Sequence, residues 1–231
     1  MADDGSATLL PLFPLGHVLM PGCPLPMRIF EPRYRQLLSD VTAEGAPRRF
    51  GVVALTAGSE VQTGPDSPAP RFAGVGTVAE ILEVQQVPDG TVALLTGGSS
   101  RFRIIRTVDT GAPYLVAEVS YLDEPDGDLP DGLVDAARAL STEYTRLFSA
   151  LTGTEQSARE PYPTDASLLS YRLASEAPLT QVDQQLLLED ATATARLLRL
   201  QRVLRRELML LRRTRTVAVS PALLRVMLRP G

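Results

Sequence analysis

Residues 10–38 have the sequence LPLFPLGHVLMPGCPLPMRIFEPRYRQLL, and this stretch is the most informative part of the chain. From Ala7 to Met27 no side chain is charged, yet five prolines interrupt the segment, at positions 11, 14, 21, 24 and 26. Each proline in a helix interior costs roughly 3 kcal/mol, and a bilayer tolerates no unpaired backbone. The preceding Asp3 and Asp4 are acidic, whereas a signal peptide begins with basic residues. We therefore predict a buried segment of a cytoplasmic protein without membrane contact.

The composition excludes several classes of enzyme. With 231 residues, 44% hydrophobic and 22% charged, the chain is typical of a globular protein with one large domain, or a domain and a subdomain. It contains no lysine, which excludes a Schiff base, a Walker lysine and a Ser–Lys dyad. His17 and Cys23 are the only residues of their kinds, too few for a Cys/His zinc site. We expect no catalytic residues, metal site or cofactor, and an inert, buried thiol at Cys23.

The first half of the chain alternates apolar and polar residues with a period of two, which is typical of β-strands. Asp89–Gly90 predicts a hairpin turn, and Gly97–Gly98–Ser99–Ser100 is interpreted as another turn. Glu31–Pro32 begins one short helix, with proline in its first turn. The Gly- and Pro-rich segment Thr56–Pro70 predicts a surface loop. The predicted strands cover residues 9–13, 26–30, 50–55, 76–87, 92–95, 101–108 and 114–122.

Beyond an acidic connector at residues 123–131, apolar residues recur with helical spacing. The first helix is predicted from the apolar residues between Leu133 and Leu151, and Gly153 is placed to end it. Thr180 and Asp183 form a T-x-x-D pattern that predicts the start of another helix. The remaining helices are predicted over residues 167–175 and 192–213. Together the patterns predict an α+β protein, a small β-barrel-like domain followed by a helical subdomain.

Charge is distributed unevenly, although the net charge is only −4. Residues 1–120 hold nine arginines and twelve acidic residues, residues 121–190 hold four and fourteen, and residues 191–231 hold ten and one. The second and third blocks therefore carry net charges of −10 and +9. We expect them to neutralise each other within the fold. Two alternatives for the arginine-rich helix are an acidic partner and the phosphates of a nucleic acid.

Several segments resemble the substrate-binding N-terminal domain of Lon proteases. The opening stretch resembles the start of that domain, and four further segments follow in the right order over residues 8–213. They are VGTVAEILEVQQVPDGTVALLTGGSSRFRI (75–104), PYLVAEVSYL (113–122), LLSYRLASEAPL (168–179) and DQQLLLE (183–189). The resemblance implies a PUA-like pseudo-barrel over residues 8–122 and a helical subdomain over 132–215, with an apolar tail at 216–231. Without lysine for an ATPase or a Ser–Lys protease, the chain looks like a stand-alone Lon-domain protein of bacteria.

The resemblance also implies a function, that of a non-catalytic module that binds unfolded or damaged polypeptides. Such a module uses an exposed apolar patch or a free strand edge, and it would act as an adaptor or regulator for a separate ATP-dependent protease. The candidate contact or motif residues are Phe13, Met20, Arg28, Phe30, Glu31, Arg33 and Tyr34. Their structural interpretation is that the aromatic rings are core and that Glu31 pairs with Arg28 and Arg33.

The alternative function is that of a PUA-like RNA- or nucleotide-binding protein, since PUA-like barrels include RNA-binding members. The acidic isoelectric point of about 5.2 argues against it. On the arginine-rich helix, the candidate partner surface consists of Arg199, Arg202, Arg206 and Arg213. A homodimer through the apolar tail is a further alternative, and no paired-carboxylate motif supports a hydrolase.

Overall fold

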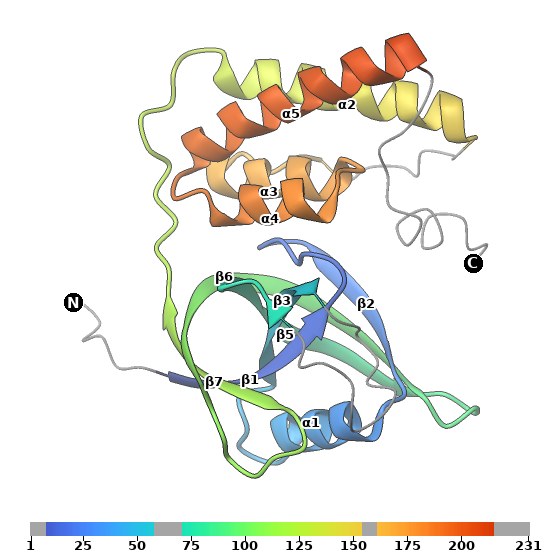
Figure 1. The fold of residues 1–231 in the computed structure, drawn as a ribbon, viewed down its shortest axis with the longest axis vertical. Coiled ribbons are helices and arrows are strands. Elements are labelled where there is room, and N and C mark those ends of the chain that lie inside the picture. The colour runs from blue at the N-terminus through green and yellow to red at the C-terminus, as the bar shows by residue number, and fades with distance from the viewer. Residues whose placement is uncertain (1–7, 58–70, 154–160, 215–231) are drawn as a thin grey trace. The chain divides into compact units, whose positions relative to one another are not determined.

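The protein is seen in a computed structural model that describes residues 8–57, 71–153 and 161–214. The chain divides into two units, Met1–Asp123 and Glu124–Gly231 (Figure 1). The strands of the first unit are β1 (Thr8–Leu15), β2 (Pro24–Ile29), β3 (Arg49–Ala57), β4 (Arg71–Phe72), β5 (Val75–Gln86), β6 (Val92–Val108) and β7 (Leu115–Tyr121), and its helix is α1 (Pro32–Thr42). The helices of the second unit are α2 (Leu133–Thr152), α3 (Ala166–Glu176), α4 (Gln181–Glu189) and α5 (Ala193–Thr214). The predicted α+β class is confirmed.

The strands of the first unit close on themselves. Their order is β1-β7-β6-β5-β3, and β1 also pairs with β3, in parallel, with Leu12 opposite Gly51. The other pairs along this path are antiparallel, and Figure 1 shows the resulting ring of strands. β2 pairs with the first part of β6, outside the ring. The barrel therefore results from one parallel contact between β1 and β3, which lie far apart in sequence.

β6 corrects one prediction. The strands predicted over 92–95 and 101–108 are a single strand, and the Gly-Gly-Ser-Ser segment between them is no turn. Gly97 and Gly98 instead lie opposite Glu80 and Ala79 on β5. A Cβ atom at Gly98 would lie 2.3 Å from the carbonyl oxygen of Met20. Gly98 therefore allows close backbone approach within a continuous strand.

Two apolar clusters use opposite faces of the same strands. Leu10 and Leu12 of β1 join side chains from β3, β5, β6 and β7 inside the barrel. Phe13 and Leu15, on the other face of β1, join the cluster that includes α1. There the rings of Phe13 and Tyr34 stack with their centroids 3.9 Å apart. β1 thus supplies side chains to both cores from its two faces, which is why it contains no charged residue.

In the second unit, α2 and α5 run parallel to each other. Near the start of α2, Gln201 Nε2 of α5 donates to the carbonyl oxygen of Leu133 over 3.1 Å. Further along both helices, Arg212 of α5 forms an ion pair with Glu143 of α2. The predicted cap of α4 is confirmed, because Thr180 Oγ1 accepts from the Asp183 amide over 3.1 Å. Gly153 ends α2 in the left-handed conformation with φ of 69°.

Two predicted segments, the apolar tail at 216–231 and most of the loop at 56–70, lie outside the described residues. Among the helices that the structure describes, none combines the length and apolar character that crossing a bilayer requires.

Candidate functional site

Phe30 lies at the corner where β2 ends and α1 begins, and its side chain is 54% exposed. Strand alternation turns Ile29 inward and Phe30 outward, and Pro32 then begins the helix. The prediction that Phe30 is core is therefore wrong, whereas it is confirmed for Phe13 and Tyr34. The corner thus presents a phenylalanine ring to solvent, between the buried Ile29 and the partly exposed Glu31.

Paired charges hold this corner on both sides of Phe30. Arg33 Nε donates to Glu31 Oε2 over 2.9 Å, and its guanidinium carbon lies 4.5 Å from the centre of the Tyr34 ring. On the other side, Arg28 donates to Asp89 Oδ2 over 2.8 Å and to Thr91 Oγ1 over 2.9 Å. The predicted Arg33–Glu31 pair is confirmed, but the ionic partner of Arg28 in the structure is Asp89 rather than Glu31.

Asp89 belongs to the β5–β6 hairpin, and sequence reasoning did not identify it as the partner of Arg28. Hydrogen bonds from the Thr91 hydroxyl and the Thr91 amide lower the pKa of Asp89, and the charge of Arg28 acts in the same direction. The carboxylate therefore stays ionised and keeps Arg28 beside the hairpin. Only the register of β2 against β6 reveals this pairing, since the two residues are 61 positions apart.

Three candidate contact residues lie in the core. Phe13, Met20 and Tyr34 are 7%, 1% and 5% exposed, so their side chains serve packing. Cys23 is buried as expected. The accessible members of the candidate set are Arg28 and Phe30, with Glu31 and Arg33 partly exposed. Contact of these residues with a polypeptide stays a prediction.

The edge of β2 that does not face β6 is poorly suited to adding another strand. Pro24 and Pro26 carry no amide hydrogen, so two of the six residues of β2 have no backbone donor. Prolines on an edge strand are a common protection against strand addition. The side chains at the corner, rather than this strand edge, are therefore the accessible feature.

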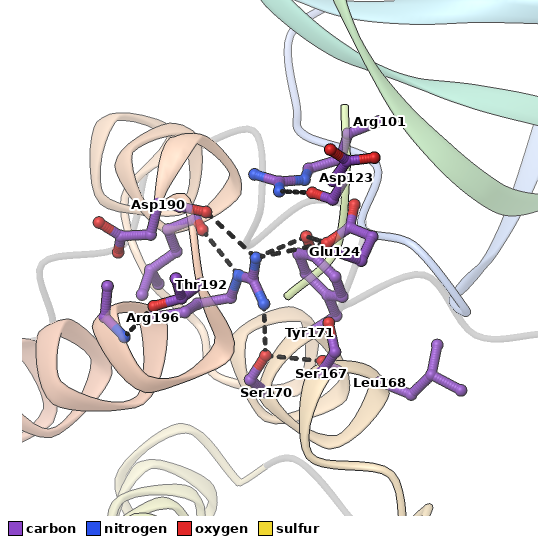
Figure 2. A network of polar contacts seen from close by, with 12 residues as sticks. Arg101, Asp123, Glu124, Ser167, Leu168, Ser170, Tyr171, Asp190, Thr192 and Arg196 are labelled. Atoms are coloured by element: carbon purple, nitrogen blue, oxygen red, sulfur yellow. Dashed lines mark hydrogen bonds and ion pairs between the residues drawn. The ribbon is translucent and has the colours of Figure 1, made fainter. Parts of the chain in front are cut away.

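The second candidate region, the arginine-rich helix α5, uses most of its charge internally. Arg196 is fully buried, and Figure 2 shows its guanidinium surrounded by acceptors. It donates to Ser170 Oγ over 2.7 Å and to Tyr171 Oη over 2.6 Å, and it lies 3.6 Å from the centre of the Tyr171 ring. Tyr171 Oη in turn donates to Glu124 Oε2 over 2.6 Å. This network connects α5 to α3 and to the first residue of the unit.

The four arginines predicted as a partner surface fall into two groups. Arg199 forms two hydrogen bonds with Asp190, and Arg206 pairs with Asp183 over 2.7 Å; these bonds raise the pKa of both guanidinium groups. Arg202 and Arg213 are exposed and have no carboxylate partner among the residues that the structure describes. The expected internal neutralisation is confirmed for Arg196, Arg199, Arg206 and Arg212.

A groove of about 270 Å³ lies between α2 and α5. Sequence reasoning missed it, because it depends on which faces of the two helices meet. Its lining consists of Leu140, Glu143, Arg205, Leu208, Met209, Arg212 and Arg213. Over residues 8–57, 71–153 and 161–214, no cluster of three or more His, Cys, Asp or Glu side chains is suited to a metal ion.

Comparison with known proteins places these features in a family. The profile of the ATP-dependent protease La (LON) substrate-binding domain matches residues 9–206. Lon protease 2 of Herpetosiphon aurantiacus is 31% identical over 220 residues, which are 90% of this chain and 26% of that protein. Lon protease of Escherichia coli is 32% identical over 139 residues, 59% of this chain and 18% of that protein. The chain thus spans at most about a quarter of the length of these relatives.

Two solved structures share the fold. A Lon N-terminal domain protein from Xanthomonas campestris is 29% identical with a TM-score of 0.59, over 84% of this chain and 96% of that one. The N-terminal domain of Lon protease from Mycobacterium avium complex, 19% identical, has a TM-score of 0.53 over 86% and 98% of the two chains. Since the family profile extends from the first strand into the last helix, this chain belongs to the LON substrate-binding domain family.

Proposed function

We propose that this protein is a non-catalytic module that recognises unfolded polypeptide segments and that Phe30 is its central contact. Membership of the LON substrate-binding domain family supports recognition of a substrate. The observation that carries the proposal is the 54% exposure of Phe30 at a corner held by charge pairs. Phe30 is also the one phenylalanine of the chain that is exposed, and all six lie within the described residues.

A fixed aromatic side chain suits weak and broad recognition. Apolar side chains are accessible in an unfolded chain and buried in a folded one, so an exposed ring distinguishes the two without reading a sequence. Because the corner is already ordered, little conformational entropy is lost when Phe30 is covered. The proline-containing edge of β2 favours side-chain contact over strand addition.

A finer proposal is that the module acts as an adaptor or regulator for a separate ATP-dependent protease. The sequence similarity to Lon proteases supports a link to proteolysis. These 231 residues contain no lysine for a Walker motif or a Ser–Lys dyad, which supports a binding role for them. Binding of RNA through α5 is less well supported, because four of its arginines already have carboxylate partners.

Fluorescence anisotropy with a labelled, net-neutral and unstructured peptide rich in Leu, Phe and Ser tests the module proposal. We expect Phe30→Ser to weaken binding about fivefold to tenfold, as for a residue central to an interface, with little change at high salt. The matched control is Leu82→Ser, because Leu82 is 57% exposed in the same unit and lies on β5. Equal losses for the two variants, or no binding by the wild-type protein, would contradict the proposal.

A further inference from the structure

The groove between α2 and α5 combines an apolar floor with a basic rim. Leu140 and Leu208 contribute apolar surface, and Met209, 50% exposed, presents a flexible thioether side chain. On α5 the lining extends from residue 205 to residue 213, about two turns or roughly 12 Å of helix. Two parallel helices with such a groove can accept the apolar side of a third helix.

The rim carries more positive than negative charge. Arg205, Arg212 and Arg213 line the groove, whereas Glu143 is the one acidic residue of the lining and is paired with Arg212. Arg205 donates to the neutral Gln201 side chain over 2.9 Å. Arg213 has no carboxylate partner within the described residues. Among the described residues, the groove therefore offers at least two cations, Arg205 and Arg213, that have no carboxylate partner.

Charge also decides between possible occupants. A second copy placed with its own groove against this one would bring arginine against arginine, which is unfavourable. The C-terminal segment of this chain, residues 216–231, contains Arg225 and Arg229 and no acidic residue, so it has the same sign as the rim. Nucleic acid has the right sign, but binding of single strands relies on aromatic side chains that stack with bases. The groove lining contains no aromatic residue.

We propose that the α2–α5 groove binds an acidic amphipathic helix of another protein. Apolar side chains of that helix cover Leu140, Leu208 and Met209, while its carboxylates pair with Arg205 and Arg213. This surface is separate from the Phe30 corner and recognises a different chemistry, a charged helix rather than an unfolded apolar segment.

The probe for this proposal is a fluorescein-labelled peptide of about 16 residues, long enough to cover two turns of α5 with flanks. It has leucine along one helical face and glutamate elsewhere, and a second peptide replaces every glutamate with glutamine. We expect the acidic peptide to bind the full-length wild-type protein at about 0.05 M salt and more weakly at about 0.5 M, since the rim is exposed. The glutamine peptide is expected to bind about tenfold more weakly.

Charge reversal at the rim provides the decisive variants. The double substitution Arg205→Glu and Arg213→Glu should weaken acidic-peptide binding about tenfold or more. Its control, Arg202→Glu with Arg146→Glu, changes the charge equally at exposed arginines outside the groove lining and should change binding less than about twofold. Met209→Gln should also weaken binding, whereas Leu198→Gln, at a similarly exposed position of α5, should not. Far-UV circular dichroism verifies that each variant is folded.

Four outcomes would overturn the proposal. They are absence of acidic-peptide binding to the wild-type protein, equal losses in the rim variant and its charge control, dimerisation that Met209→Gln abolishes, and tighter rim-dependent binding of a labelled oligouridine than of the peptide. Phe30→Ser should leave acidic-peptide binding intact. Loss of acidic-peptide binding at the groove can therefore be distinguished from loss of polypeptide binding at the Phe30 corner.

Discussion

At the scale of single residues, the guanidinium of Arg196 is buried, and each of its three nitrogens donates a hydrogen bond. Its Nε donates to the Leu187 carbonyl oxygen over 3.1 Å, and its other contacts are to Ser170, Tyr171 and the Asp190 carbonyl. Glu124 Oε2 lies 3.7 Å away. A buried charge with this many partners is tolerated, but removing one partner leaves the others unsatisfied.

We therefore predict that Arg196→Met lowers the free energy of unfolding by about 3–5 kcal/mol, because it removes the donor to Ser170 Oγ and Tyr171 Oη and the positive charge beside the Glu124 carboxylate. Arg196→Lys should recover only part of this loss, since an ammonium group lacks the planar fork of the guanidinium. Urea unfolding followed by circular dichroism measures the effect. Arg202→Met, at an exposed position on the same helix, should change stability by no more than about 0.5 kcal/mol. Equal stability of Arg196→Met and wild type would show that the network adds nothing.

At the scale of elements, the barrel depends on how closely β3, β5 and β6 approach one another. A Cβ atom at Gly76 of β5 would lie 2.4 Å from the Val52 carbonyl oxygen and 2.6 Å from the Phe102 ring. Neither group can move without disturbing the pairing of β3 with β5 or the apolar cluster inside the barrel. A Cβ atom at Gly74, just before β5, would have no atom of the described residues within 4 Å beyond its chain neighbours.

Gly76→Ala is therefore expected to destabilise the protein by about 2–4 kcal/mol through overpacking. Gly74→Ala is the matched control, two residues away and with the same chemical change, and should stay within about 0.5 kcal/mol of wild type. Thermal and urea unfolding of the two variants give the comparison. A tolerated Gly76→Ala would mean that β3 and β5 can separate more easily than their packing indicates.

At the scale of the whole molecule, each unit has its own core and its own charge balance. The first unit, through Asp123, has a net charge of −4 from nine arginines and thirteen acidic residues. The second has fourteen arginines and fourteen acidic residues, so its charges cancel. The acidic and basic blocks of the sequence thus belong to one unit, in which Asp183, Asp190 and Glu143 pair with α5.

Because the cores are separate, a substitution in one core should raise hydrogen exchange mainly in its own unit. We expect Gly76→Ala to increase deuterium uptake in peptides from β5 and β6, and Arg196→Met to increase it in peptides from α3 and α5. Hydrogen–deuterium exchange with mass spectrometry measures both in the full chain. Equal increases in both units for either variant would indicate that they unfold as one cooperative body.

Much of the architecture followed from local signals in the sequence. Pro32 in a first turn, the Thr180 cap and Gly153 at a helix end mark real boundaries, because capping and φ preferences act over a few residues. Because these signals are local, they do not report contacts between distant segments, and the predictions that depended on such contacts were wrong. Gly97 and Gly98 have the composition of a turn, but they lie within β6, where Gly98 packs against the backbone of Met20, far away in sequence.

Sequence patterns were sufficient for the α+β class, the boundaries of most helices, the burial of most non-proline apolar side chains between residues 10 and 29, and the family resemblance. Only the tertiary structure decided that Phe30 faces solvent, that Arg28 pairs with Asp89, and that α2 and α5 enclose a basic groove. Periodicity specifies which residues of an element are buried. The partner that covers them, and the charges left over, depend on strand register and helix packing between segments that lie far apart in the chain.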